Sequence, residues 1–395
     1  MNIIDEAHRR AIAVLESASR PSGFFASGLK GGYAATWARD SMIASLGGSL
    51  VGKKFEIPFR KSLETLSKNQ SEHGQIPNAV GDYNTERRSK ITFNSVDSTL
   101  WYIIGHFVYA AAYKNKAILK KRQKNIANAL TWLGYQDPNE DTLIVQQPTT
   151  DWQDAFPHKY GRVLSTEALY FAALNFLGYK EKAEHIKQVV NGEIEKYLSL
   201  YDPKRGYYLP WIWKTHNKYR EEEHWFDTFG NLVAIISGLA TPKIAKSILD
   251  YIDHAKINRP YPCKAIYPPI KRGTKEWKDY FEDAEAREPY HYLNGGVWPF
   301  LGGFYVAALV KDRQFKKAEK ELELLAKANK LVQKNAPVKD FLATRSLSEV
   351  WGFYEWLDGR TGKIIGGSNP YQSWSAGMYI FAYECVKKRR VPYFG

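Results

Sequence analysis

The strongest constraint on the fold is a set of six helical segments that are apolar on almost every side. Two examples are NSVDSTLWYIIGHFVYAAAY (94–113) and FDTFGNLVAIISGLA (226–240). A helix that is hydrophobic all round is buried all round. The six segments begin near residues 37, 94, 163, 226, 296 and 371, and each interval leaves room for one more helix and a loop.

The segments between them have the opposite character. YKEKAEHIKQVVNGEIEKYLSL (179–200), for example, has one apolar stripe and a charged face, as a surface helix does. Six buried helices that alternate with six amphipathic ones predict an all-α fold, a single (α/α)6 barrel formed by residues 1–395. The twelve helices are expected over residues 2–18, 37–51, 57–69, 94–113, 116–133, 163–178, 180–199, 226–239, 241–253, 296–311, 313–331 and 371–388.

Small residues and the shortage of strand patterns support this architecture. Strand-like alternation is confined to two short stretches, 143–147 and 207–213, which are expected as strands within loops. Glycines within the apolar segments allow helix backbones to approach closely. The glycines expected at such contacts are Gly47, Gly48, Gly302, Gly303 and Gly377.

Basic residues outnumber acidic ones by 56 to 42, which gives a formal net charge of +14. Such a balance occurs in proteins that bind nucleic acid or anionic membranes. Here the lysines lie mostly on amphipathic helix faces, as in residues 117–130 and 314–334. We therefore expect a solvated outer surface, and neither nucleic acid nor a membrane as partner. No uncharged apolar run reaches the roughly 18 residues that a membrane span needs.

The cysteines and the first residues indicate a compartment. Cys263 and Cys385 are too few and too far apart for a disulfide framework or a zinc knuckle, and the histidines lack zinc-site spacing. The segment MNIIDEAHRR has two acids and no apolar core, unlike a secretory signal. We expect a cytoplasmic, reduced protein without a metal or another cofactor. The oligomeric state is left open by the sequence.

Aromatic residues point to the ligand class. The chain has 12 Trp, 26 Tyr and 19 Phe, and many of the tryptophans stand beside Asp, Glu, Asn or Gln. A pyranose has apolar C–H faces, on which an aromatic ring can stack, and a rim of hydroxyl groups that polar side chains can bind. Trp37, Trp152, Trp298 and Trp374 are therefore expected to border one pocket, although Trp298 could equally be a core residue because it lies in an apolar run.

Polar and aromatic motifs cluster at the N-terminal ends of the buried segments. In a toroid these ends surround one mouth. An acid or serine at a helix N-terminus can be a simple cap, but caps do not require tryptophans. The motifs are TWARD (36–40), NSVD (94–97), DWQD (151–154), HWFD (224–227), HYLNGGVW (291–298) and YQSW (371–374).

A funnel of this kind suits cleavage of a glycosidic bond. The reaction needs one protonated carboxyl, which releases the leaving oxygen, and one carboxylate, which activates water or attacks the sugar. Asp97 lies in an apolar run, where burial would keep it protonated. Glu355 lies in the turn-rich loop WGFYEWLDGRTGK (351–363) and could face Asp97 across the barrel. Glu167 and Asp154 are the substitutes if either assignment fails.

Four segments resemble two related groups of inverting glycosidases. They are VDSTLWYIIGHF, FDTFGNLVAIISGLAT, NGGVWPFLGGFYVAALVK and EWLDGRTGKIIGGSNPYQSWSAGMYI, and their order and spacing extend over residues 30–390. One group is the amylo-α-1,6-glucosidase part of glycogen-debranching enzymes, and the other is the neutral/alkaline invertases, which hydrolyse sucrose. Both groups have the (α/α)6 barrel.

The resemblance implies roles for individual residues. Asp97 would be the general acid and Glu355 the general base, and Trp37, Arg39 and Asp40 match a motif that lines a glucose subsite. The activity implied is that of an inverting, exo-acting α-glucosidase of the debranching type on an oligosaccharide or disaccharide. The remaining candidates for substrate binding are Trp152, Asp154, Glu167, Asp227, Asn231, His291, Asn294, Trp298, Gln372 and Trp374.

Other functions fit parts of the same pattern. NLVAIISGLAT and DGRTGKIIG look closer to invertases, so sucrose is the alternative substrate. An epimerase or lyase on this fold would rely on histidines, for which His106, His224 and His291 are candidates. A non-catalytic sugar-binding protein would keep the tryptophans without an acid pair. The acidic run Glu221–Glu223 is expected as a solvated loop, with a calcium site as the alternative.

Overall fold

A computed structural model describes residues 2–29, 33–82, 89–216, 219–333 and 350–394 of this chain. Six of its α-helices are buried along nearly their whole length, as the apolar segments predict. In α2 every residue is buried, and in α11 every residue except Lys311. The six are α2 (Ala38–Gly48), α4 (Asp97–Ala112), α7 (Leu164–Leu177), α9 (Thr228–Ser237), α11 (Pro299–Lys311) and α13 (Ser373–Lys388).

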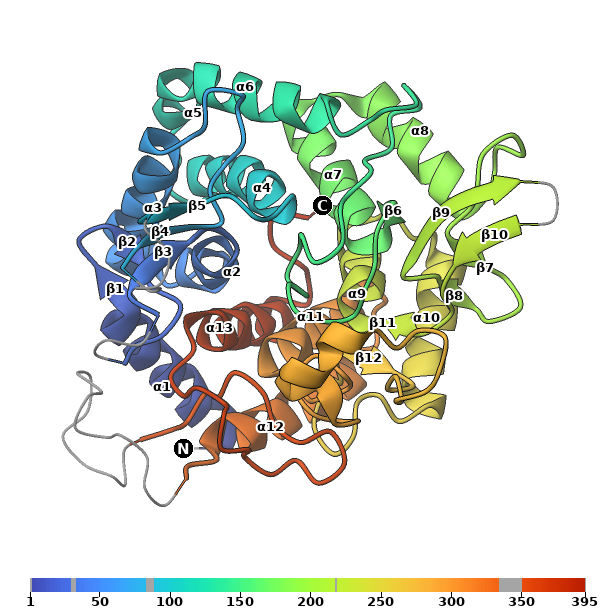
Figure 1. The fold of residues 1–395 in the computed structure, drawn as a ribbon. Helices are drawn as coiled ribbons and strands as arrows, with labels where there is room; N and C mark the ends of the chain where they lie inside the picture. The colour runs from blue at the N-terminus through green and yellow to red at the C-terminus, as the bar shows by residue number, and fades with distance from the viewer. Residues whose placement is uncertain (1, 30–32, 83–88, 217–218, 334–349, 395) are drawn as a thin grey trace.

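These buried helices form a closed ring. Each packs against the next in chain order, from α2 through α4, α7, α9 and α11 to α13, and α13 packs against α2. Figure 1 shows them around one centre. At the closure Gly47 and Gly377 face each other so tightly that a Cβ on either would overlap the opposite backbone. Gly303 meets the backbone at Met378 in the same way, so these glycines are needed for the close approach.

The amphipathic helices lie outside the ring (Figure 1). In α10 the buried residues Ile244, Ile248 and Ile252 recur every four positions and form one inward stripe. Helix α1 packs on α13, α8 on α7 and α12 on α11. The outer helices are α1 (Ile3–Ala18), α3 (Glu56–Lys68), α5 (Ala117–Lys121), α6 (Gln123–Gly134), α8 (Lys180–Asn191), α10 (Pro242–His254) and α12 (Phe315–Lys330).

Two outer helices differ from the sequence-based expectation. The helix expected over 116–133 is interrupted at Arg122, which separates α5 from α6. The helix expected over 180–199 ends at Asn191. Gly192 takes a left-handed conformation there (φ 79°), and its N–H bonds to the carbonyl of Val189, so the glycine terminates the helix.

Short antiparallel sheets join the helices. The strand expected over 207–213 is split into β8 and β9, whereas residues 143–147 contribute only an isolated bridge between Gln146 and Gly161. One three-stranded sheet has the order β3-β4-β5 and another β10-β9-β6, and the other three sheets are two-stranded. The strands are β1 (Ser19–Arg20), β2 (Gly23–Phe24), β3 (Ala35–Trp37), β4 (Ala79–Gly81), β5 (Ile91–Thr92), β6 (Arg162–Val163), β7 (Tyr201–Asp202), β8 (Tyr207–Tyr208), β9 (Trp211–His216), β10 (Tyr219–Glu222), β11 (Phe226–Asp227) and β12 (Ile266–Tyr267).

Three of these strands lead directly into ring helices. β3 continues into α2 at Trp37, β6 into α7 at Val163, and β11 into α9 at Asp227. The strands therefore fix the polar motifs at the N-terminal ends of the ring helices. Within the described ranges, none of the helices combines the length and the apolar character needed to cross a membrane.

Candidate active site

One small cavity, of about 80 Å³, lies at the N-terminal ends of α2, α11 and α13. It collects polar and aromatic residues from four of the predicted motifs and from the loop that carries Glu355. The lining residues are Ala26, Tyr33, Trp37, Arg39, Asp40, Trp152, Asp154, Tyr292, Trp298, Glu355, Gln372 and Trp374.

Tryptophans form much of the wall. The rings of Trp152 and Trp298 pack edge to face at 5.5 Å, and those of Trp298 and Trp374 at 5.7 Å. Phe300 stacks behind Trp374 at 4.3 Å and holds it in place. Trp298 belongs both to the core and to the cavity, because it is 2% exposed and its indole N–H bonds to the carbonyl of Tyr292.

Three side-chain donors at this wall are available to a ligand. Trp152 Nε1, Gln372 Nε2 and Trp374 Nε1 are buried without a hydrogen-bond partner among the described residues. A buried N–H group without a partner costs free energy unless a bound molecule accepts its hydrogen bond. Hydroxyl groups of a sugar are suitable acceptors.

Arg39 is the cation of the cavity. Its Nη1 donates to both carboxylate oxygens of Asp97, at 2.9 and 3.2 Å, and its Nη2 lies 3.7 Å from Oδ2 of Asp154. Asp97 is 1% exposed and does not line the cavity. Burial raises the pKa of Asp97, as expected, although Arg39 opposes the rise. Asp97 therefore contacts a residue of the cavity lining, Arg39, without lining the cavity itself.

Two other aspartates reach the cavity. Burial raises the pKa of Asp40 to about 6. Desolvation by the surrounding protein raises the pKa of Asp154 to about 6 as well, although part of its side chain is exposed, and the charge of Arg39 opposes both shifts. They differ in position, because Asp40 is 6% exposed on the first turn of α2, whereas the side chain of Asp154 is 37% exposed. Asp154 therefore stands at the mouth and Asp40 at the floor.

Glu355 faces the same space and is held by two donors. The hydroxyl of Tyr33 lies 3.3 Å from each carboxylate oxygen, and Nδ2 of Asn369 donates to Oε2 at 3.2 Å. Burial, with a contribution from Asp40, raises the pKa of Glu355 to about 7, although the two donors oppose the rise. Burial raises the pKa of Tyr292, and the negative charges of Glu355 and Asp154 add to this rise. Tyr292 therefore lies within electrostatic reach of both carboxyls.

Three of these residues were not identified from the sequence. Tyr33 lies in a loop without a recognised motif, whereas Tyr292 and Asn369 lie in segments that were singled out from the sequence for other residues. The only signal for Asn369 is its position shortly before the YQSW motif, and that for Tyr292 its place inside HYLNGGVW.

Five predicted substrate-binding residues do not line the cavity. Glu167 accepts the N–H of Ile144, and burial raises its pKa well above the usual range. Asn231 bonds to the backbone of Tyr208, and Asn294 bonds to the backbone of Ile270. These side chains tie loops to helices. The other two are Asp227, which is fully buried, and His291, whose Nε2 lies 3.3 Å from Oδ2 of Asp358.

A family model described as amylo-alpha-1,6-glucosidase matches residues 22–380. The chain belongs to this family. The match includes every residue that lines the cavity and the ring helices as far as residue 380, within α13, and it confirms the recognition of a glycoside hydrolase family from the sequence.

Curated relatives of this amylo-alpha-1,6-glucosidase family member are plant invertases. An alkaline/neutral invertase of Arabidopsis thaliana is 27% identical over 208 residues, which is 52% of this chain and 33% of the relative. A mitochondrial neutral/alkaline invertase 1 of Oryza sativa subsp. japonica is 31% identical over 193 residues, or 48% of this chain and 26% of the relative. The chain thus matches about a third or less of the length of these relatives.

Solved structures share the fold of this amylo-alpha-1,6-glucosidase family member. A glycosidase variant is similar with a TM-score of 0.66 at 14% identity, with 98% of this chain and 97% of the other covered. A GH63 mannosylglycerate hydrolase from Thermus thermophilus, in complex with Tris and D-glycerate, gives a TM-score of 0.65 at 14% identity, with 95% and 99% covered. Their folds are those of helix-rich glycosidases.

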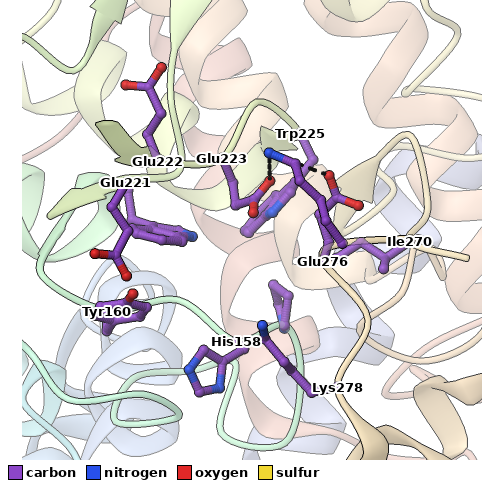
Figure 2. Close-up of a pocket in the computed structure, with 12 residues that line it drawn as sticks. His158, Tyr160, Glu221, Glu222, Glu223, Trp225, Ile270, Glu276 and Lys278 are labelled. Atoms are coloured by element: carbon purple, nitrogen blue, oxygen red, sulfur yellow. Dashed lines mark ion pairs between the residues drawn. The ribbon is translucent and has the colours of Figure 1, made fainter. Parts of the chain in front are cut away.

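A second cavity, of about 220 Å³, is lined in part by His158 and Tyr160, which follow residues 151–154 in the chain (Figure 2). Lys275 pairs there with Glu223 and Glu276, and burial raises the pKa of Glu223 to about 7. The acidic run Glu221–Glu223 borders this second cavity. Throughout the part of the chain that is described, no group of three or more His, Cys, Asp or Glu is arranged to hold a metal ion.

Proposed function

We propose that this protein is an inverting, exo-acting glycoside hydrolase that cleaves an α-glucosidic bond, with Asp154 as general acid and Glu355 as general base. The observation that carries the proposal is a single cavity in which these carboxyls stand among four tryptophans, an arginine and unpaired N–H donors. A glycosidase requires two carboxyls on opposite sides of the scissile bond.

Asp154 is preferred as the acid because of its position. The leaving group carries the rest of the substrate, so it must point out of a closed pocket toward the mouth. Asp154 is the exposed carboxyl there, whereas Asp40 lies on the floor and Asp97 pairs with Arg39 outside the cavity. In this proposal Asp40 binds sugar hydroxyls, and Asp97 is the counter-ion that fixes Arg39.

Glu355 is preferred as the base because its surroundings suit a carboxylate. Tyr33 and Asn369 donate hydrogen bonds to it and leave lone pairs free for a water molecule. The pKa values of about 6 for Asp154 and about 7 for Glu355 lie close together, so the two carboxyls titrate as a pair near neutral pH, and the reactive form carries one proton between them.

The architecture in this proposal is a single catalytic domain with an (α/α)6 barrel. The closed ring of six buried helices and the outer layer support it. The N-terminal ends of α2, α11 and α13 would supply cavity walls, and short strands such as β3 would fix the first residues of the helices that they precede.

The substrate class follows from the family. Amylo-alpha-1,6-glucosidase is the description of the matching model, so an α-1,6-linked glucose residue is the first candidate. Sucrose is the second candidate, because the curated relatives are named invertases. Both molecules place a glucosyl ring in a closed subsite and differ in the leaving group.

A hydrolysis screen tests the proposal. Purified protein would be offered isomaltose, panose, maltose, trehalose and sucrose, and released glucose would be measured. Hydrolysis of panose or isomaltose is expected to be fastest, and preference for sucrose would select the second candidate. If none is cleaved while glucose binds by calorimetry, the cavity serves binding only and the proposed enzyme is rejected.

A further inference from the structure

One lysine is completely buried beside the segment that carries Asp154. Lys159 has no exposed surface, and its Nζ lies 2.8 Å from Oδ2 of Asp151 and 3.8 Å from Oδ2 of Asp227. The ammonium also donates to Oε1 of Gln153 at 2.6 Å. Asp151 and Asp227 are as deeply buried as the lysine.

Burying an ammonium group has a large desolvation cost that only well-placed partners offset. The core does not need this group, because an apolar side chain could fill the same volume. The ammonium group instead binds the side chains of residues 151 and 153 and so holds both in place. These residues flank Trp152, which lines the cavity, and lead directly to Asp154.

We propose that Lys159 is a positioning residue that acts on Asp154 through Asp151 and Gln153. These contacts fix the position of the Asp154 carboxyl and the charges that surround that carboxyl. The inference rests on the role of Asp154 as general acid. Lys159 itself does not line the cavity, so it touches neither the sugar nor the attacking water.

The charges around Asp154 explain the effect. Arg39 and Asp40 face it from α2, Asp97 from α4, and Asp151 from its own segment. The negative charge of Asp151 raises the pKa of Asp154, and Lys159 is the cation that partly offsets that charge. Removal of the charge on Asp151 should therefore lower the pKa of Asp154, and removal of Lys159 should raise it.

Three variants test this directly: Asp151→Asn, Lys159→Met and the double variant with both changes. The readout is the titration of the Asp154 carboxyl, followed by NMR in protein labelled with ¹³C at aspartate side chains. The Asp154 resonance is identified by its absence in Asp154→Asn. This readout does not require activity, so it separates the inference from the proposed function.

In Asp151→Asn the pKa of Asp154 is expected to fall by about one pH unit. Because the productive protonation state becomes rarer, kcat/KM should fall about tenfold on the best substrate from the screen. Lys159→Met should move the pKa in the opposite direction. The double variant replaces the buried pair by neutral groups, so it remains interpretable even if Lys159→Met alone does not fold.

Lys264→Met is the matched control. Lys264 is also buried, and its Nζ donates only to backbone carbonyls of Lys256 and Arg259. The Lys264→Met variant should have a lower thermal stability than the wild type and the same pKa for Asp154. The inference is overturned if the titration of Asp154 is the same in Lys159→Met as in the wild type or, where Lys159→Met does not fold, the same in the double variant as in Asp151→Asn. If the titration moves but kcat/KM does not follow, Lys159 acts as inferred and Asp154 is not the acid.

Discussion

Arg39 donates two hydrogen bonds to Asp97, the shorter at 2.9 Å, and both side chains are almost completely buried. The sequence assigns Asp97 the role of general acid, whereas this ion pair gives Asp97 a different contact, with Arg39. Asp97 supplies the charge that holds Arg39, and Asp154, at the edge of the same guanidinium, faces the ligand space.

The first prediction contrasts these two aspartates. Asp154→Asn should lower turnover of a natural substrate by about 10²–10⁴ with little change in stability, because a general acid is lost. It should keep much of its activity on a glucosyl fluoride, whose leaving group needs no proton. Asp97→Asn should instead lower the free energy of unfolding by about 3–5 kcal/mol, because Arg39 is left buried without its partner. Kinetics on both substrates and thermal unfolding measure this, and the reverse pattern would return the acid role to Asp97.

The second prediction concerns the base and the stereochemistry. Glu355→Gln should lower turnover by about 10²–10⁴ and leave binding of glucose intact. In the wild-type protein the first sugar released from an α-glucoside should be the β-anomer, as seen by NMR within the first minutes. Release of the α-anomer would exclude an inverting reaction even if both carboxyls are essential.

The third prediction is a pH dependence. The pKa values of about 6 for Asp154 and about 7 for Glu355 predict a bell-shaped profile of kcat/KM centred between them. The hydrogen bond from Tyr33 lowers the pKa of Glu355, so Tyr33→Phe should raise that pKa. The alkaline limb should then move to higher pH, and the maximum should decrease because fewer molecules carry the proton on Asp154. A profile that moves to lower pH would contradict this assignment.

The fourth prediction concerns the unpaired donors of the wall. Gln372→Leu should weaken binding of glucose, because leucine lacks the Nε2 group that would donate a hydrogen bond to a sugar hydroxyl. A loss of about 1–3 kcal/mol in binding free energy is expected by calorimetry. Asn294→Leu is the comparison, since its bonds to Ile270 and Ala286 are structural and its loss should reduce stability more than affinity. Equal affinity of the Gln372 variant and the wild type would remove this residue from the subsite.

The fifth prediction concerns the closure of the ring. Gly377→Ala places a methyl group against the backbone of Ala44 on α2, so it should lower the free energy of unfolding by about 1–3 kcal/mol or more. Gly134→Ala is the matched control, because its Cβ meets no atom and alanine favours a helix. Thermal unfolding should order the proteins with Gly134→Ala at or above the wild type and Gly377→Ala below it.

The helices could be predicted from the sequence because their signals are local. An all-round apolar segment such as 299–310 can only be buried, and a single stripe such as that of α10 can only face a core. Local signals failed where a single residue decides the backbone path. Gly192 ends α8 early, and no periodicity shows that its left-handed conformation is used there.

The site could be predicted only in part. The sequence by itself determined which motifs precede the ring helices, and the four tryptophans of four of those motifs, Glu355 and Asp154 do meet in one cavity, although Trp225 of HWFD does not join them. It could not determine which of several acids faces the ligand, because Asp97, Asp40 and Asp154 lie in similar motifs and Glu167 lies near the start of a buried helix as well. Only the tertiary structure decided this, since the direction and exposure of a carboxyl depend on distant residues. Arg39 from α2 covers Asp97 on α4, and the backbone of Ile144 occupies Glu167, so only contacts across the ring leave Asp154 open at the mouth.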